Sequence, residues 1–402
     1  MPRRTVPADP SIGERIRARR QLRRWSMRHA SARAGIAHTT WGRVERGELR
    51  TDRYMIADLA AALECSVTDL TGRPYTPADR AAESAQARVE PMWRALLEIA
   101  PDEPPAGPPL PWPALAARLE LLDARRTQSD YAALGQILPD LLLDLHAATH
   151  GRDARAALVA LVDATNTARG TLRALGRVAE AALAAERCRQ TAERLDEPVP
   201  LAVADWARAN AASGGGSYRR ALTLTTRAAE ELRHHTSADG ALMMLGMLHL
   251  SSAVAELRAR PAIAIGHLDA AADLAARTGE VRSWWMWWGP TNVGIWRMGV
   301  LVDAGEPGRA VEVAGAVRPD VLESADRRAT YHLEFARALA DLGGSRDREA
   351  VRALLTAERL APQRMRTYTS ARETARFLHD RSWRDAGGSA LRGLCERMGV
   401  GG

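Results

Sequence analysis

The sequence predicts an all-α protein in which a small basic domain precedes a long array of paired helices. Apolar residues recur at helical spacing through most of the 402 residues, and no alternating strand pattern of useful length follows residue 113. Residues 1–75 contain 15 Arg against 8 Asp and Glu, so this segment accounts for the whole net charge of +7. In the second half, similar helix openings recur at spacings of 40 to 48 residues, as in repeat proteins.

All 56 basic residues are arginine, and the chain contains no lysine. This absence excludes enzymes that form a lysine Schiff base, including the usual pyridoxal phosphate enzymes. It also argues against P-loop NTPases and protein kinases, which need a phosphate-binding lysine. A basic segment joined to a neutral remainder favours a polyanionic partner, with nucleic acid first. An arginine-rich solvated surface is the alternative interpretation.

The cysteine pattern and the apolar segments indicate a cytoplasmic protein. Cys65, Cys188 and Cys395 are far apart and form no CxxC motif, so neither a disulfide framework nor a zinc site is predicted. The chain begins without the apolar region of a secretory signal. Its most apolar stretch, residues 240–255, is interrupted by His249 and is too short to span a membrane. We therefore expect no membrane segment.

Residues 11–75 contain five short helical patterns in succession. Ser11-Ile-Gly-Glu14 and Ser66-Val-Thr-Asp69 are capping boxes that open the first and the fifth helix. The second helix ends at Gly35, and the third covers residues 38–46. A short helix, a turn that contains glycine and another short helix form the helix-turn-helix arrangement. The remaining predicted caps are Ser26 for the second helix and either Thr51 or Asp52 for the fourth.

The segment from Trp25 to Gly47 resembles the XRE family of phage Cro and repressor proteins, and the resemblance extends over about residues 11–72. The features that carry it are the Ser26 cap, the Ala30/Ala34 pair, the turn residue Gly35 and the ending Val44-Glu-Arg-Gly47. The resemblance implies a five-helix DNA-binding domain over residues 1–75. Its third helix would lie in the major groove of a double-stranded operator.

The family resemblance assigns DNA-contacting roles to six residues. Four residues of the third helix are implied to face base edges, namely His38, Thr39, Gly42 and Arg43. Arg43 is the best candidate for a bidentate contact to guanine. Two later residues, Arg50 and Arg53, are implied to hold the phosphate backbone. The resemblance also implies structural roles, with a buried core position for Trp41 and Val44 and a buried ion pair for Arg20 and Glu45.

The same segment departs from the family pattern at four positions. Ala37 replaces the usual Ser cap of the third helix, and Met27 and His29 stand where Gln and Glu are common. Gly42 inside a helix costs about 1 kcal/mol relative to Ala, although it would also let the backbone approach DNA closely. A domain that has come to bind protein instead of DNA is the alternative.

Residues 76–113 are predicted to connect the basic domain to the rest of the chain. A polar helical stretch begins at Thr76 and ends near Arg88, and Pro91 is expected to break it. Seven of the thirteen residues 101–113 are proline, which predicts a stiff, extended spacer between two separate units. A proline-rich ligand for another domain is the alternative.

Residues 114–402 are predicted to form a tetratricopeptide-like α-solenoid with a concave face, which would dimerise and sense a ligand. The second helices of successive pairs open alike, with a small residue that permits close packing, at Ala179, Ala221, Ala262, Ala310 and Ala350. The fourteen expected helices cover residues 114–126, 129–149, 152–174, 177–194, 199–212, 217–235, 239–259, 262–278, 290–304, 307–317, 325–342, 346–360, 364–380 and 388–398.

This second part also resembles the C-terminal halves of many actinobacterial XRE regulators. The likeness lies in residues 289–293, 304–310 and 358–362. More distantly, the whole layout resembles the peptide receptors of Gram-positive quorum sensing, in which Asn side chains on the concave face hold a peptide backbone. The resemblance therefore implies a peptide or small-molecule effector.

The chain contains only three asparagines, Asn166, Asn210 and Asn292, and all are expected in first helices of pairs. A ladder of such amides would hydrogen-bond an extended peptide. Because the three lie at different distances from the following turn glycines, purely structural roles are the alternative.

Tryptophans are concentrated in residues 283–290, where four occur within five positions. On a helix, Trp284, Trp287 and Trp288 would share one face, and Trp296 lies in the expected helix 290–304. These four are candidate ligand contacts. Core packing and a dimer contact are the alternatives to a pocket.

The sequence shows no catalytic, metal-binding or cofactor-binding motif, so we expect no enzyme and no cofactor. The leading hypothesis is a dimeric transcriptional regulator that binds an operator and senses a peptide or small molecule. The alternative is a protein-interaction scaffold that the basic domain tethers to DNA.

Overall fold

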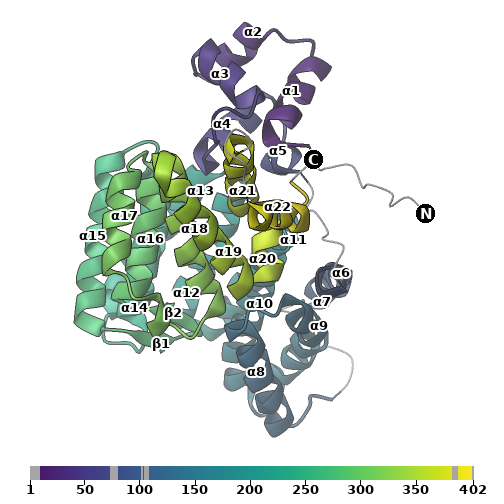
Figure 1. The fold of residues 1–402 in the computed structure, drawn as a ribbon. Coiled ribbons are helices and arrows are strands. Elements are labelled where there is room, and N and C mark those ends of the chain that lie inside the picture. The colour runs from purple at the N-terminus through teal and green to yellow at the C-terminus, as the bar shows by residue number, and fades with distance from the viewer. Residues whose placement is uncertain (1–9, 73–79, 101–102, 104–107, 383–387, 401–402) are drawn as a thin grey trace.

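The computed structural model describes residues 10–72, 80–100, 103, 108–382 and 388–400. Within these residues the chain is all-α except for one two-stranded hairpin, so the predicted fold class is confirmed. None of the helices in these ranges is long and apolar enough to cross a lipid bilayer. Figure 1 shows a small helical head, residues 10–72, at one end of a larger body of stacked helices.

The head contains the five predicted helices. They are α1 (Ile12–Leu22), α2 (Met27–Arg33), α3 (His38–Glu45), α4 (Arg53–Ala62) and α5 (Val67–Thr71). Ser11 and Glu14 form the predicted reciprocal capping box, and Ser66 and Asp69 form the second one. The cap of α4 is Asp52, whose carboxylate accepts from two backbone amides. The helices enclose one apolar core, whose fully buried members include Ile16, Trp41, Leu59, Leu63 and Leu70.

Two helices that the sequence assigned to a connector, α6 (Arg80–Ala87) and α7 (Val89–Glu98), belong to the body instead. Met92 and Leu96 share an apolar core with Leu138 of α9 (Tyr131–Ala148). The helix is interrupted at Arg88, close to the predicted end, and Pro91 lies in the first turn of α7, where no amide donor is needed. Six residues of the proline-rich segment, 101–102 and 104–107, lie outside the described ranges, so the stiff, extended spacer stays a prediction.

The body continues as antiparallel helix pairs that stack side by side. The remaining helices are α8 (Trp112–Thr127), α10 (Ala154–Ala174), α11 (Val178–Leu195), α12 (Pro198–Gly214), α13 (Tyr218–Leu232), α14 (Ala241–Glu256), α15 (Pro261–Thr278), α16 (Pro290–Asp303), α17 (Pro307–Ala316), α18 (Ala325–Leu342), α19 (Asp347–Leu360), α20 (Pro362–Thr367), α21 (Thr369–Ser382) and α22 (Ser389–Met398). The expected helix 364–380 is divided, because the backbone of Tyr368 is extended between α20 and α21.

The small residues expected between paired helices are only partly those predicted. Three are fully buried, namely Ala221, Ala310 and Ala350. Ala179 and Ala262 are exposed, and the buried contacts are made by Ala181 and Ala264 two positions later. The opening pattern therefore identified the helices correctly but misplaced the packed face in two of them.

The tryptophan-rich run is a β-hairpin, so Trp284, Trp287 and Trp288 do not share a helical face. Strand β1 (Val281–Ser283) pairs antiparallel with β2 (Met286–Trp288), and Ser283 lies opposite Met286. Trp284 and Trp285 form the two-residue turn with φ of 47° and 57°. Positive φ at both turn positions is the geometry that a short hairpin requires. The side chains of the run therefore alternate between two faces.

Candidate functional site

The outer face of α3 is exposed, and its inner face is held rigidly in the head. His38, Thr39 and Arg43 are exposed, whereas Trp41 and Val44 are buried. In Figure 1, α2 and α3 lie on the side of the head that points away from the body. The three exposed side chains are thus accessible to a large partner.

A buried ion pair anchors the end of α3, as the sequence predicted. Arg20 Nε donates to Glu45 Oε1 at 2.6 Å and Nη2 donates to Oε2 at 2.9 Å. The indole Nε1 of Trp41 donates to the same carboxylate at 2.6 Å. Burial alone would raise the pKa of Glu45, but the hydrogen bonds from Arg20 and Trp41 lower it overall.

Gly42 is buried within this face, beneath a residue that the sequence reasoning did not single out. A Cβ at Gly42 would lie 3.1 Å from Arg46 Nη1, so the Arg46 side chain covers this position. Arg46 is itself exposed and donates from Nε to Glu48 at 2.7 Å. In this arrangement Arg46, rather than Gly42, faces solvent.

Arg50, a predicted phosphate contact, is engaged by the body. Its Nε donates to Asp341 Oδ1 of α18 at 3.1 Å, and Nη2 donates to the second carboxylate oxygen. The Arg50 side chain is only 12% exposed. Burial and the nearby charge of Arg337 lower the pKa of Arg50. A free phosphate-binding role does not fit this docked position, because Asp341 already occupies the guanidinium. The side chain of Arg53 lies outside what the structure describes.

Three further contacts fix the head to the body through α4. The Tyr54 hydroxyl donates to the carbonyl of Val254 in α14, and the Tyr54 ring packs on Tyr218 of α13 with a centroid separation of 4.8 Å. Arg258 forms an ion pair with Asp58 at 2.6 Å. The docked position is thus maintained by both buried and exposed polar contacts.

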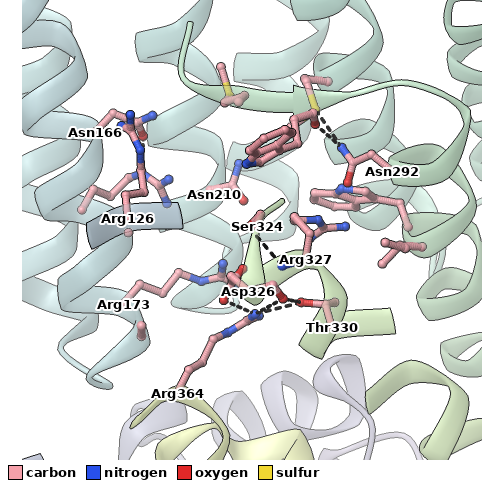
Figure 2. A pocket seen from close by; sticks show the side chains of 18 of the residues that line it. Arg126, Asn166, Arg173, Asn210, Asn292, Ser324, Asp326, Arg327, Thr330 and Arg364 are labelled. Atoms are coloured by element: carbon pink, nitrogen blue, oxygen red, sulfur yellow. Dashed lines mark hydrogen bonds and ion pairs between the residues drawn. The ribbon is translucent and has the colours of Figure 1, made fainter. Parts of the chain in front are cut away.

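The inner face of the helix stack encloses a cavity of about 320 Å³. All three asparagines line it from different helices, Asn166 from α10, Asn210 from α12 and Asn292 from α16. Figure 2 shows these side chains around one space. The sequence reasoning therefore selected residues that the fold brings together across more than a hundred positions.

The four candidate tryptophans divide between this cavity and other locations. Trp287 and Trp296 line the cavity, whereas Trp284 lines a separate surface hollow. Trp288 is fully buried in the core, and its Nε1 donates to Thr278 Oγ1 at 2.9 Å. The correction follows from the hairpin, whose alternation sends neighbouring side chains to opposite faces. Two cavity residues that the sequence reasoning missed are Trp206 and Trp285.

The asparagine amides make different contacts, so they do not form a uniform ladder. Asn166 Oδ1 accepts from Arg169 Nε at 2.9 Å, and Asn210 Nδ2 donates to the carbonyl of Trp206 at 2.9 Å. Asn292 Nδ2 donates to the carbonyl of Trp287 at 2.8 Å, while its Oδ1 is buried without a partner among the described residues. Two other atoms of lining residues, Ser251 Oγ and Trp206 Nε1, are also buried without a hydrogen-bond partner among the described residues.

Arginines of the cavity differ in how their charge is balanced. Arg364 donates to Asp326 and to Thr330 Oγ1. Burial lowers the pKa of Arg364, but the nearby charge of Asp326 outweighs burial and raises it overall. Arg169 is 6% exposed and forms no ion pair with a described residue; burial and the charge of Arg173 lower its pKa to about 9. Burial likewise lowers the pKa of Arg327 to about 10, with Asp326 opposing that effect. Among the described residues, no group of three or more His, Cys, Asp or Glu could hold a metal ion.

Comparisons with known proteins give a structural likeness but no match to a family model or a curated protein. Among solved structures, it is similar to the crystal structure of Bacillus thuringiensis PlcR in complex with the peptide PapR7 and DNA. The sequence identity is 15%, the match covers 67% of this chain and 95% of PlcR, and the TM-score is 0.31. A TM-score this low establishes no common fold.

Proposed function

We propose that this protein is a transcriptional regulator of the XRE type, rather than an enzyme, and that α3 reads the major groove of its operator. The observation that carries the proposal is the two-sided character of α3. His38, Thr39 and Arg43 of α3 are exposed, α3 lies on the side of the head away from the body, and the Arg20–Glu45 pair fixes the buried face of the helix. The net charge of residues 1–75 supplies the attraction to phosphate.

The body acts as the sensor in this proposal, and its cavity binds a small molecule or a short peptide. Val254 lines the cavity and accepts the hydrogen bond from Tyr54 of the head, so the cavity wall is directly connected to α4. A ligand that prefers one position of this wall shifts the docking of the head. In a dimer, that shift changes the separation of the two α3 helices, which must match half-sites one helical turn apart or a multiple of it.

The docked position is the restrained state. Here Arg50 is held by Asp341 and is withheld from DNA. Release of the head would free Arg50 for the phosphate contact that the family resemblance implies.

A DNA-binding assay tests the proposal. Fragments from beside the protein's own gene are titrated with the full chain, in competition with unrelated DNA. Arg43→Ala should weaken the preference for the specific fragment, because a contact to a base edge is lost. Arg227→Ala, which removes an exposed arginine of α13 on the body, is the matched control and should leave it unchanged. Equal preference of the wild type for all fragments would refute the proposed function.

A further inference from the structure

The cavity carries an excess of positive charge that its own carboxylates do not neutralise. Five arginines line it, namely Arg126, Arg169, Arg173, Arg327 and Arg364, against the two carboxylates of Asp326 and Glu334. Arg126 is paired with Asp123 and Asp163, which balances its charge. Asp326 and Glu334 are likewise already paired, with Arg364 and Arg337 respectively.

Three lining arginines therefore remain without a carboxylate partner among the described residues: Arg169, Arg173 and Arg327. Arg169 and Arg173 lie one turn apart on α10, an arrangement in which like charges repel. Arg327 approaches from α18 on another wall, and its Nε and Nη2 are buried without a partner among the same residues. Figure 2 shows Arg173 and Arg327 on either side of the same space. Arg169 is buried and Arg173 and Arg327 are partly buried, and unbalanced cations in such positions are costly unless a negative group joins them.

Two of these guanidinium groups lie over indole rings that line the cavity. Arg169 lies 5.1 Å from the Trp206 ring centroid, and Arg327 lies 6.0 Å from that of Trp296. Guanidinium groups stacked on indole are held in a fixed orientation. The rings place apolar surface next to the charges, so the site is both cationic and aromatic.

We propose that the effector is a small organic anion, with a carboxylate or similar group at Arg169, Arg173 and Arg327 and an apolar body against the tryptophans. This inference rests on the proposed function, because it names the ligand class of the same sensing cavity. The volume of about 320 Å³ suits a small molecule or the end of a short peptide. Asn292 Oδ1 and Ser251 Oγ, which have no partner among the described residues, offer hydrogen bonds to a polar group of the ligand.

Matched acid and amide probes test this inference by calorimetric titration of the full chain. We expect 2-naphthoate to bind at least tenfold more tightly than 2-naphthamide. The tripeptide Ala-Ala-Trp with a free C-terminus, compared with its C-terminal amide, distinguishes a peptide carboxylate from a free organic acid. Equal binding of acid and amide in both pairs, or no binding of either acid, would overturn the inference.

Variants assign the binding to the proposed arginines. Arg169→Gln and Arg327→Gln should each weaken binding of the preferred acid by at least tenfold, whereas the control Arg227→Gln on α13 should not. Because Arg169→Gln removes an unbalanced buried charge, the melting temperature of this variant should not fall below that of the wild type. Acid binding that persists in a folded Arg169→Gln/Arg327→Gln double variant would refute the assignment. DNA binding is measured on the same samples, so loss of acid selectivity with intact operator preference refutes only the anion inference. Selective binding of the acid without a preference for the operator would refute only the proposed function as a transcriptional regulator.

Discussion

Replacement of Asp341 by Asn should release the head and strengthen DNA binding. The substitution keeps the shape of the side chain and one acceptor oxygen but removes the charge that faces Arg50. Arg50 would then remain in a mostly buried position, with Arg337 nearby as a repelling charge. The docked arrangement loses an attraction that the released arrangement does not use.

The size of the effect follows from the exposure of the pair. The side chains of Arg50 and Asp341 are 12% and 25% exposed. Exposed ion pairs contribute about 0.2–1 kcal/mol, and breaking a fully buried pair costs about 3–5 kcal/mol. This partly buried, two-contact pair therefore stabilises docking by roughly 1–2 kcal/mol. If docking limits DNA binding, affinity should rise by a factor of about 5–30.

Fluorescence anisotropy with a labelled operator, repeated at several salt concentrations, measures this change. Release of Arg50 adds a phosphate contact, so the slope of log affinity against log salt should steepen by about 0.9. Asp269→Asn is the matched control, because Asp269 pairs with Arg297 at 2.6 Å within the body. The double variant with Arg50→Ala should lose the extra slope. Unchanged affinity and slope in Asp341→Asn would refute the restraining role of this ion pair.

Four other predictions follow from named contacts. Arg43→Ala should reduce discrimination between the operator and unrelated DNA by about 1–3 kcal/mol in competition titrations, and unchanged discrimination would contradict its role at a base edge. Glu45→Ala leaves Arg20 and the Trp41 indole without their shared acceptor, so denaturant unfolding of the head should show a loss of roughly 2–4 kcal/mol; a smaller loss than 1 kcal/mol would argue against the anchor. Gly246→Ala should lower the melting temperature, because the new Cβ would lie 2.0 Å from a Trp288 ring atom, whereas Gly266→Ala in α15 meets nothing within 4 Å and should raise it. The Nδ1 atoms of His249 and His267 lie 2.9 Å apart, and burial together with the charge of His267 lowers the pKa of His249 to about 4. Because the unfolded chain binds more protons at this site than the folded chain, the free energy of unfolding should fall as the pH drops from about 6.5 to 4. His249→Gln should flatten that dependence, and an equally steep curve would show that other groups cause it.

Features that depend on a few neighbouring residues were predictable from the sequence. The capping boxes at Ser11 and Ser66 and the apolar spacing in the head define its helices, because caps and side-chain stripes act within one or two turns. The same period placed the three asparagines on first helices, and stacking of similar pairs brings first helices to one inner face. The expectation of one shared cavity therefore followed from repetition.

Features that depend on distant partners were not predictable in this way. The Trp284–Trp285 turn has no glycine or asparagine to indicate positive φ, and its conformation accompanies insertion of Trp288 beside Gly246. The interruption of the helix near Pro91 was predictable, but the packing of Met92 and Leu96 of α7 into the core of the body was not.

By itself, the sequence determined an all-α chain with a basic helix-turn-helix head and a neutral body of helix pairs, because local periodicity, caps and charge counts need no partner. Only the tertiary structure decided which charges are balanced. Arg50 meets Asp341 across 291 positions, while Arg169 and Arg327 meet no carboxylate within the described residues. The sequence alone does not distinguish one arginine from another. The role of each depends on its burial and on the groups that the stacking of the helices brings within a few ångströms.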